Sequence, residues 1–364
     1  GMTTRGGAGC AAAGRGCAGA LLGRQAAMAA QARKSAAGLQ PAGAAPSSKD
    51  LPDPLLPAPD LLDPQWLRWT DREIRRWLKR ILALGAPSSP PLAARAELSL
   101  SLMETTLAPA GGRRLHQRGT LADLKLRFPT AFGLSRLRLA ARRLEDLDER
   151  FIQEQMSSFP PPGKPPQRVL LTPGGDHLLV VSPQVTAWLL ERFARQAVAR
   201  GPVVWKCPAV LKDDPARPWG PGSFLFDGQG RPCAPALLAG PQQALGEGGR
   251  PSFPQVRISY RQPPQPVPTN LILSHLPEAA VPGTDYVHLL EPVVRSAEGC
   301  LVRGVRQTGA GSCRPILARL AAGLEDLLDE DSRAAPGKAY VPGTGFVAAA
   351  TLLASPVSVT DWGG

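Results

Sequence analysis

Apolar residues recur at spacings of three and four along the segment WTDREIRRWLKRIL, which is the first strongly periodic stretch of the chain. The spacing predicts a helix whose buried face is formed by Ile74, Trp77, Leu78 and Ile81. Thr70 and Glu73 have the spacing of a capping box, and the helix is expected to stop near Gly85. The opposite face carries four cations, namely Arg72, Arg75, Arg76 and Lys79. We therefore expect one buried face and one strongly positive face.

Helical patterns continue downstream of this segment. Residues 93–107, 120–126 and 134–151 each carry apolar positions at helical spacing, and a tight connector at 128–133 separates the last two. Together with the first helix they predict a small basic helical bundle over residues 63–155. A Pro-rich linker is expected at 156–167, and a disordered Ala/Gly/Pro-rich tail at 1–62.

The bundle resembles a sterile alpha motif (SAM) domain, in particular its pointed variant, over residues 63–150. The first helix of that family matches Trp69, Thr70, Glu73, Ile74, Trp77 and Leu78. The later helices of the family match Thr120, Asp123, Leu124, Gly133 and Leu137 through Leu147. The pointed variant adds Asp63-Pro64, and Pro129 four residues ahead of Gly133. The resemblance implies association through complementary charged faces, while an unrelated small helical bundle would fit the same periodicity.

The second half of the chain follows a different pattern. Residues 168–210 read as a strand, a Pro-Gly-Gly-Asp turn, a second strand, a helix capped by Ser182 and ended by Gly201, and a third strand. Residues 211–364 are expected to form a loop-rich mixed α/β region, with an amphipathic helix at 317–330. The predicted fold class is therefore α+β, a SAM-like helical bundle followed by a mixed α/β region with Pro/Gly-rich loops.

Charge is distributed unevenly, and this bears on function. The 364 residues carry a net charge of +12, and the stretch from Trp66 to Arg143 contains 16 Lys/Arg against 5 Asp/Glu. Any contact with an anionic partner is therefore expected in this region. The candidate binding residues are Arg72, Arg75, Arg76, Lys79, Arg136 and Arg138. They favour an adaptor that binds a protein partner or itself, with a nucleic-acid-binding regulator as the alternative.

Catalytic and metal-binding patterns are weak throughout the sequence. Asp176, His177 and Ser182 lie close together, but no G-x-S-x-G elbow surrounds Ser182, so a helix cap is the simpler role. The six cysteines form no CxxC pair, and Gly343–Gly345 lack the context of a dinucleotide site. We expect no enzyme activity, no cofactor, no metal and no small-molecule ligand.

The N-terminal segment and hydropathy bear on location. Residues 1–49 are rich in Ala and Gly and contain six Lys/Arg but no acid, a composition shared by mitochondrial presequences, disordered tails and translated leaders without function. No run of about 18 apolar residues is present, so no membrane span is expected. The expected location is cytoplasmic or nuclear, with a mitochondrial matrix factor as the alternative.

Overall fold

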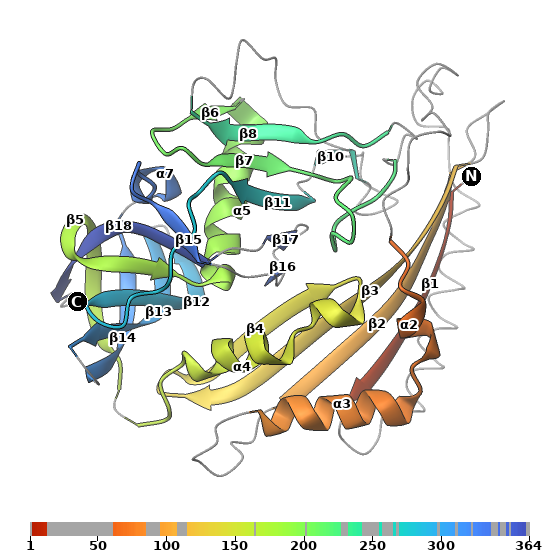
Figure 1. The fold of residues 1–364 in the computed structure, drawn as a ribbon, viewed down its shortest axis with the longest axis horizontal. Helices are drawn as coiled ribbons and strands as arrows, with labels where there is room; N and C mark the ends of the chain where they lie inside the picture. The colour runs from red at the N-terminus through yellow and green to blue at the C-terminus, as the bar shows by residue number, and fades with distance from the viewer. Residues whose placement is uncertain are drawn as a thin grey trace.

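The chain is dominated by β-sheet in the computed structural model (Figure 1). The structure describes residues 2–12, 61–84, 95–107, 115–163, 165–200, 202–226, 232–241, 255–256, 265–266, 269–296, 299–309, 312–321, 323–335, 341–342, 347–348 and 351–361. One antiparallel sheet forms the N-terminal part, and two six-stranded sheets form the C-terminal part. A further short pair joins β9 (Gln255–Val256) to β10 (Gln265–Pro266).

The N-terminal sheet has the strand order β1-β2-β3-β4. Its strands are β1 (Met2–Ala12), β2 (Arg95–Leu107), β3 (Leu115–Thr130) and β4 (Gly133–Ala141). Leu98, Leu124 and Leu139 lie side by side in register on one face. Because side chains alternate along a strand, the residues between these leucines point to the opposite face.

Helices cover the leucine face of this sheet (Figure 1). They are α2 (Pro64–Arg68), α3 (Asp71–Ala83) and α4 (Glu149–Ser157), with a short 3-10 helix at Leu144–Asp146. The predicted capping box of α3 is present, since the Thr70 hydroxyl accepts from the Glu73 N–H and the Glu73 carboxylate accepts from the Thr70 N–H. The predicted buried face of α3 is confirmed as well.

The C-terminal part contains two sheets. The first has the order β12-β13-β14-β5-β18-β15, and β12 also pairs with β5. Its strands are β5 (Gln167–Val181), β12 (Tyr286–Ser296), β13 (Gly299–Thr308), β14 (Ser312–Leu320), β15 (Arg333–Ala335) and β18 (Thr351–Asp361). The second has the order β16-β17-β11-β7-β8-β6. Its strands are β6 (Val203–Val204), β7 (Val210–Asp213), β8 (Ala236–Gly240), β11 (Asn270–Ser274), β16 (Val341–Pro342) and β17 (Val347–Ala348).

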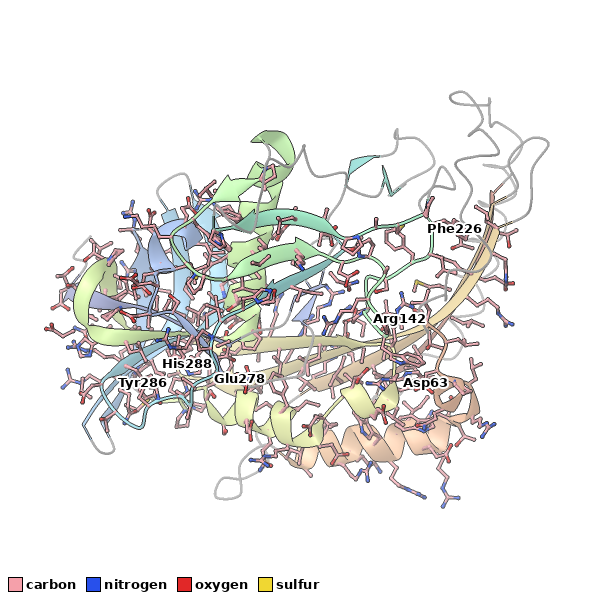
Figure 2. All side chains as sticks on the ribbon, turned by 45° about the horizontal axis from the view of Figure 1, so that its top comes forward. Asp63, Arg142, Phe226, Glu278, Tyr286 and His288 are labelled. Atoms are coloured by element: carbon pink, nitrogen blue, oxygen red, sulfur yellow. The ribbon has the colours of Figure 1, made fainter. Side chains whose placement is uncertain are left out.

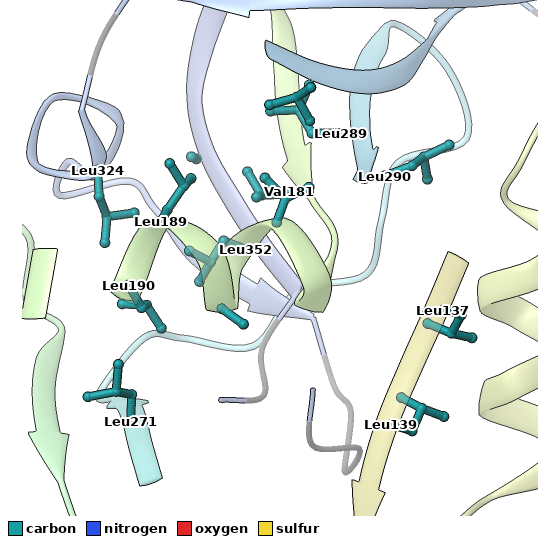
Figure 3. Close-up of a cluster of buried hydrophobic side chains, with 14 of the residues drawn as sticks. Leu137, Leu139, Val181, Leu189, Leu190, Leu271, Leu289, Leu290, Leu324 and Leu352 are labelled. Atoms are coloured by element: carbon teal, nitrogen blue, oxygen red, sulfur yellow. The ribbon is translucent and has the colours of Figure 1, made fainter. Parts of the chain in front are cut away.

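Helix α5 (Pro183–Arg200) packs between these two sheets. Ser182 caps it as predicted, because its hydroxyl accepts from the Val185 N–H at 3.3 Å. Leu190 of α5 points toward Leu271 of β11, whereas Leu189 lies near Leu324 of the short helix α7 (Leu324–Leu327) (Figure 3). The C-terminal sheets are thus held together through one helix that is apolar on several sides.

The expected helical bundle is wrong, and so is the SAM resemblance. Residues 93–107 and 120–126 fall largely on β2 and within β3, and 134–151 divides into β4, the 3-10 helix and the start of α4. Only α3 keeps its expected form. Along β3, Leu124, Leu126 and Phe128 are buried and alternate with Lys125 and Arg127, which is the period of a strand. Register with neighbouring strands overrides the high helix propensity of Leu, Lys and Arg here.

Two expectations in the second half are also corrected. The Pro-Gly-Gly-Asp sequence is not a turn, because Pro173–Asp176 continues the single strand β5. Gly174 adopts φ +86°, which favours glycine, whereas a Cβ on Gly175 would lie 1.9 Å from the Ser358 nitrogen, so Gly175 lets β18 approach closely. The helix expected at 317–330 is the end of β14 followed by the single turn of α7.

The expected tail and loop-rich region differ from the structure as well. Within 1–62, Met2–Ala12 forms the edge strand β1, and the Leu61 carbonyl accepts from the Thr120 N–H at 2.8 Å. The rest of that tail, 13–60, lies outside the described residues. Region 211–364 supplies most strands of both C-terminal sheets, so the fold class is largely β rather than a helical bundle joined to a mixed region.

Candidate anion-binding surfaces

The exposed face of α3 carries the basic stripe that the sequence predicts. We define the α3 stripe as Arg72, Arg75, Arg76 and Lys79, all of which are exposed. Together with Asp71, these side chains line an open depression of about 540 Å³. Four cations and one carboxylate therefore face a space that an anionic group can enter.

The α3 stripe is not neutralised by its neighbours among the described residues. None of its four cations has a described carboxylate within 4.0 Å. Arg80, one turn further along, differs because it pairs with Glu149 of α4 at 3.1 Å. Glu73 feels the charge of Arg76, but hydrogen bonds from the Thr70 N–H and hydroxyl chiefly lower its pKa, so its carboxylate is held at the cap.

Three tryptophans fix the orientation of α3. The ring of Trp69 lies 5.3 Å from that of Trp66 and 6.1 Å from that of Trp77, measured between centroids. The Trp66 indole N–H donates to the Arg142 carbonyl at 2.7 Å, which ties the cluster to the end of β4. Because Trp77 is buried beneath the helix, the stripe must face outward.

Arg136 and Arg138 lie on a different surface from the α3 stripe. Both are on β4, where Leu137 and Leu139 point to the helix-covered face and the two arginines to the opposite face. Arg138 donates two hydrogen bonds to Asp123, at 2.9 and 2.8 Å, and these raise its pKa. The six predicted binding residues are thus divided between two surfaces separated by a sheet.

Arg142, which the sequence analysis missed, joins the N-terminal sheet to the C-terminal part (Figure 2). Its guanidinium donates to four main-chain carbonyls at 2.6–3.1 Å, those of Thr120, Gly220, Pro221 and Ser223. Burial lowers its pKa to about 10, so it stays charged at neutral pH. No sequence pattern marks such a residue, because its partners are backbone atoms far away in the chain.

The residues that suggested a hydrolase do not form a catalytic group. The Ser182 hydroxyl donates to the Leu290 carbonyl at 2.9 Å and caps α5, so it is engaged structurally. His177 instead contacts Arg306, with 2.9 Å between Nε2 and Nη2. Within the described part of the chain, no group of three or more His, Cys, Asp or Glu is arranged to hold a metal ion. None of the helices described in this structure is long and apolar enough to cross a membrane.

Comparison with known proteins identifies the fold. No protein-family model and no curated protein matches the sequence. Solved structures do match, among them TldE from Thermococcus kodakarensis, with a TM-score of 0.61, 13% identity, and coverage of 92% of this chain and 84% of that chain. A proposed modulator of DNA gyrase from Bacteroides thetaiotaomicron matches with a TM-score of 0.60 and 9% identity, covering 94% and 84%.

A proposed modulator of a DNA gyrase from Thermotoga maritima shows the same likeness. It has a TM-score of 0.52 and 13% identity, and the match covers 82% of this chain and 77% of that chain. These values establish a shared fold built mostly from β-sheet, which overturns the SAM-like assignment.

Proposed function

We propose that this chain is a non-enzymatic binding protein that docks an acidic protein surface on the α3 stripe. The observation that carries the proposal is the set of four exposed cations, without described carboxylate partners, around one open depression. Clustered cations of this kind steer an oppositely charged surface during encounter and select against positively charged partners.

Asp71 favours a protein partner over a nucleic acid. Its carboxylate lines the same depression as the four cations, where it would repel a phosphate backbone but could pair with a cation of a protein. The stripe is also short, since the eight residues from Arg72 to Lys79 span roughly 10 Å of helix. Nucleic-acid binding remains the alternative, and the experiment below separates it from protein binding.

The names of two structural neighbours support a regulatory binding role. Both are described as proposed modulators of DNA gyrase, a role that requires contact with another macromolecule. We extend only this broad role to the present chain, and purified DNA gyrase is one partner to test. The non-enzymatic character belongs to the same proposal, and it is supported by the structural engagement of Ser182.

Charge reversal on the α3 stripe tests the proposal. Arg72→Glu with Arg76→Glu is compared with Lys206→Glu combined with Lys212→Glu, which makes the same net change at exposed positions of the C-terminal half. Fluorescence anisotropy is measured with a labelled oligoglutamate peptide, with purified DNA gyrase and with duplex DNA. We expect the α3 reversal to weaken binding of the peptide at least tenfold and the control to change it less than twofold. Tight DNA binding that the reversal abolishes would replace this proposal with the nucleic-acid alternative.

A cytoplasmic or nuclear site of action also belongs to this proposal. The composition of residues 1–49 makes mitochondrial import the competing location. Imaging of a fluorescent reporter fused after residues 1–49 distinguishes them. Diffuse or nuclear signal agrees with the proposal, and co-localisation with a mitochondrial marker contradicts it.

A further inference from the structure

Three arginines form a row across the N-terminal sheet, on the face that α3 and α4 leave uncovered. Arg95 of β2 lies directly opposite Arg127 of β3, and Arg127 lies directly opposite Arg136 of β4. We call these three residues the arginine ladder. Neighbouring strands lie about 4.8 Å apart, so the outer two backbones are separated by roughly 10 Å.

The ladder places positively charged side chains directly opposite each other on neighbouring strands. The Arg136 N–H donates to Glu291 at 3.2 Å and its carbonyl accepts from Gln184 at 3.1 Å, so both groups point away from β3. Arg127 and Arg136 are therefore a non-hydrogen-bonded pair, the arrangement in which opposing Cα atoms approach to about 4.5 Å. Like charges directly opposite each other destabilise a sheet unless a neighbouring carboxylate or a bound anion neutralises them.

Neighbouring carboxylates neutralise only one arginine of the ladder. Arg95 is paired with Glu97 at 2.7 Å. Further along the same face, Asp123 is shared by Arg138 at 2.8 Å and Lys125 at 3.6 Å. Neither Arg127 nor Arg136 has a described carboxylate within 4.0 Å of its side chain.

The charges on this face leave a surplus at its centre. The face presents five cations on β2, β3 and β4, which are Arg95, Lys125, Arg127, Arg136 and Arg138, against Glu97 and Asp123. Arg127 is half-buried in the middle of this group. Partial burial weakens the screening of its charge by water, which increases the attraction for an anion.

We propose that the arginine ladder binds a compact anion carrying several phosphate groups. Guanidinium groups bind phosphate oxygens through paired, planar hydrogen bonds. The unpaired forks of Arg127 and Arg136, next to Arg95, match consecutive phosphates better than one carboxylate. The described residues on this face of β2, β3 and β4 include no aromatic side chain on which a base could stack. The site thus recognises phosphate groups, and the sheet separates it from the α3 stripe.

Isothermal titration calorimetry of the full chain with sodium tripolyphosphate measures the affinity of the site and tests the proposal. The variant Arg127→Gln with Arg136→Gln is compared with Arg168→Gln combined with Arg314→Gln, two exposed arginines on β5 and β14. We expect the ladder variant to weaken binding at least tenfold and the control to stay within twofold. Equal affinity of the ladder variant and the unmodified chain would overturn the proposal.

Further measurements test whether the ladder variant loses binding because it is misfolded. The ladder variant should unfold at the same temperature as the unmodified chain or higher without ligand, and tripolyphosphate should raise the midpoint of the unmodified chain only. Arg136→Lys keeps the charge without the planar fork, so it should weaken binding about threefold to fivefold.

The source of the phosphate groups is tested with other ligands. A nucleoside triphosphate that binds as tightly as tripolyphosphate supports recognition of phosphates whatever their carrier, and weaker binding of the nucleotide points to free oligophosphate. A single-stranded DNA oligomer that binds more tightly than either would contradict a compact anion.

Discussion

The guanidinium of Arg142 donates to the main-chain carbonyl of Ser223 at 2.6 Å, although 81 residues separate the two in the chain. The same side chain reaches the carbonyls of Gly220 and Pro221, at 2.7 and 3.1 Å. The end of β4 is therefore fastened to the loop that follows β7 by one buried cation surrounded by backbone carbonyls. This contact fixes how the N-terminal sheet meets the C-terminal part.

Arg142→Met should destabilise the protein by about 3 kcal/mol, because it leaves several buried carbonyls without a donor. Arg150→Met is the control, since Arg150 makes an exposed pair with Glu154 that contributes about 0.5 kcal/mol or less. Urea unfolding followed by tryptophan fluorescence measures both. Equal midpoints for the two variants would show that the Arg142 contacts do not hold the parts together.

Trp77→Ala should lower the free energy of unfolding by about 3–5 kcal/mol, because the ring is 4% exposed and packs beneath α3 against Trp69. Leu67→Ala, on the neighbouring helix α2, removes a side chain that is 53% exposed and should change stability by about 0.5 kcal/mol or less. Thermal unfolding by circular dichroism compares them. A Trp77 variant as stable as the Leu67 variant would refute the buried face of α3.

Gly175→Ala should destabilise by about 3 kcal/mol, since the new methyl group would meet the β18 backbone at Val357 and Ser358. Gly283→Ala provides the control because no atom lies within 4 Å of a Cβ there. Differential scanning calorimetry should place the Gly175 variant well below the control. Coincident midpoints would mean that β5 and β18 do not approach as closely as described.

Asp213 should make stability depend on pH. Burial raises its pKa from 3.8 to about 6, although Thr269 and Asn270 donate hydrogen bonds to one of its oxygens. A carboxyl group whose pKa is higher in the folded state adds stability that is fully present below pH 3.8 and is lost as pH rises through 6. Relative to Asp213→Asn, the unmodified chain should gain about 2 kcal/mol between pH 7.5 and pH 4.5. Paired urea titrations at the two pH values measure this difference, and a constant difference would contradict the buried carboxyl.

The elements that the sequence predicted correctly are helices whose caps and apolar faces are formed by residues close together in the chain. Helix α3 was correctly predicted from its capping box and apolar spacing, and α5 from Ser182 and its apolar face. The strands β3 and β4 were mistaken for helices because leucines at every second position also satisfy parts of a helical pattern. Strict alternation of Leu with Lys and Arg was the signal that could have identified them. The role of Gly175 depends on β18, which is far away in the sequence, so the Pro-Gly-Gly-Asp segment looked like a turn.

Of the candidate surfaces, the sequence predicted the one that lies on a single helix and not the one that lies across several strands. The α3 stripe followed from helical periodicity, and its exposure agrees with that prediction. Arg136 and Arg138 were grouped with it, whereas strand geometry turns them to the opposite face of the sheet. Arg95 and Arg127 were missed because their alignment with Arg136 depends on the register of three strands, which composition does not encode.

The central claim, that the α3 stripe docks an acidic protein surface, is tested most directly by a charge-swap titration. Oligoglutamate and oligolysine peptides are titrated against the unmodified chain and against Arg72→Glu with Arg76→Glu, at the same low ionic strength. We predict that the unmodified chain prefers oligoglutamate and that the reversed variant prefers oligolysine, with each affinity changing at least tenfold. Unchanged affinity for both peptides after reversal would contradict the claim.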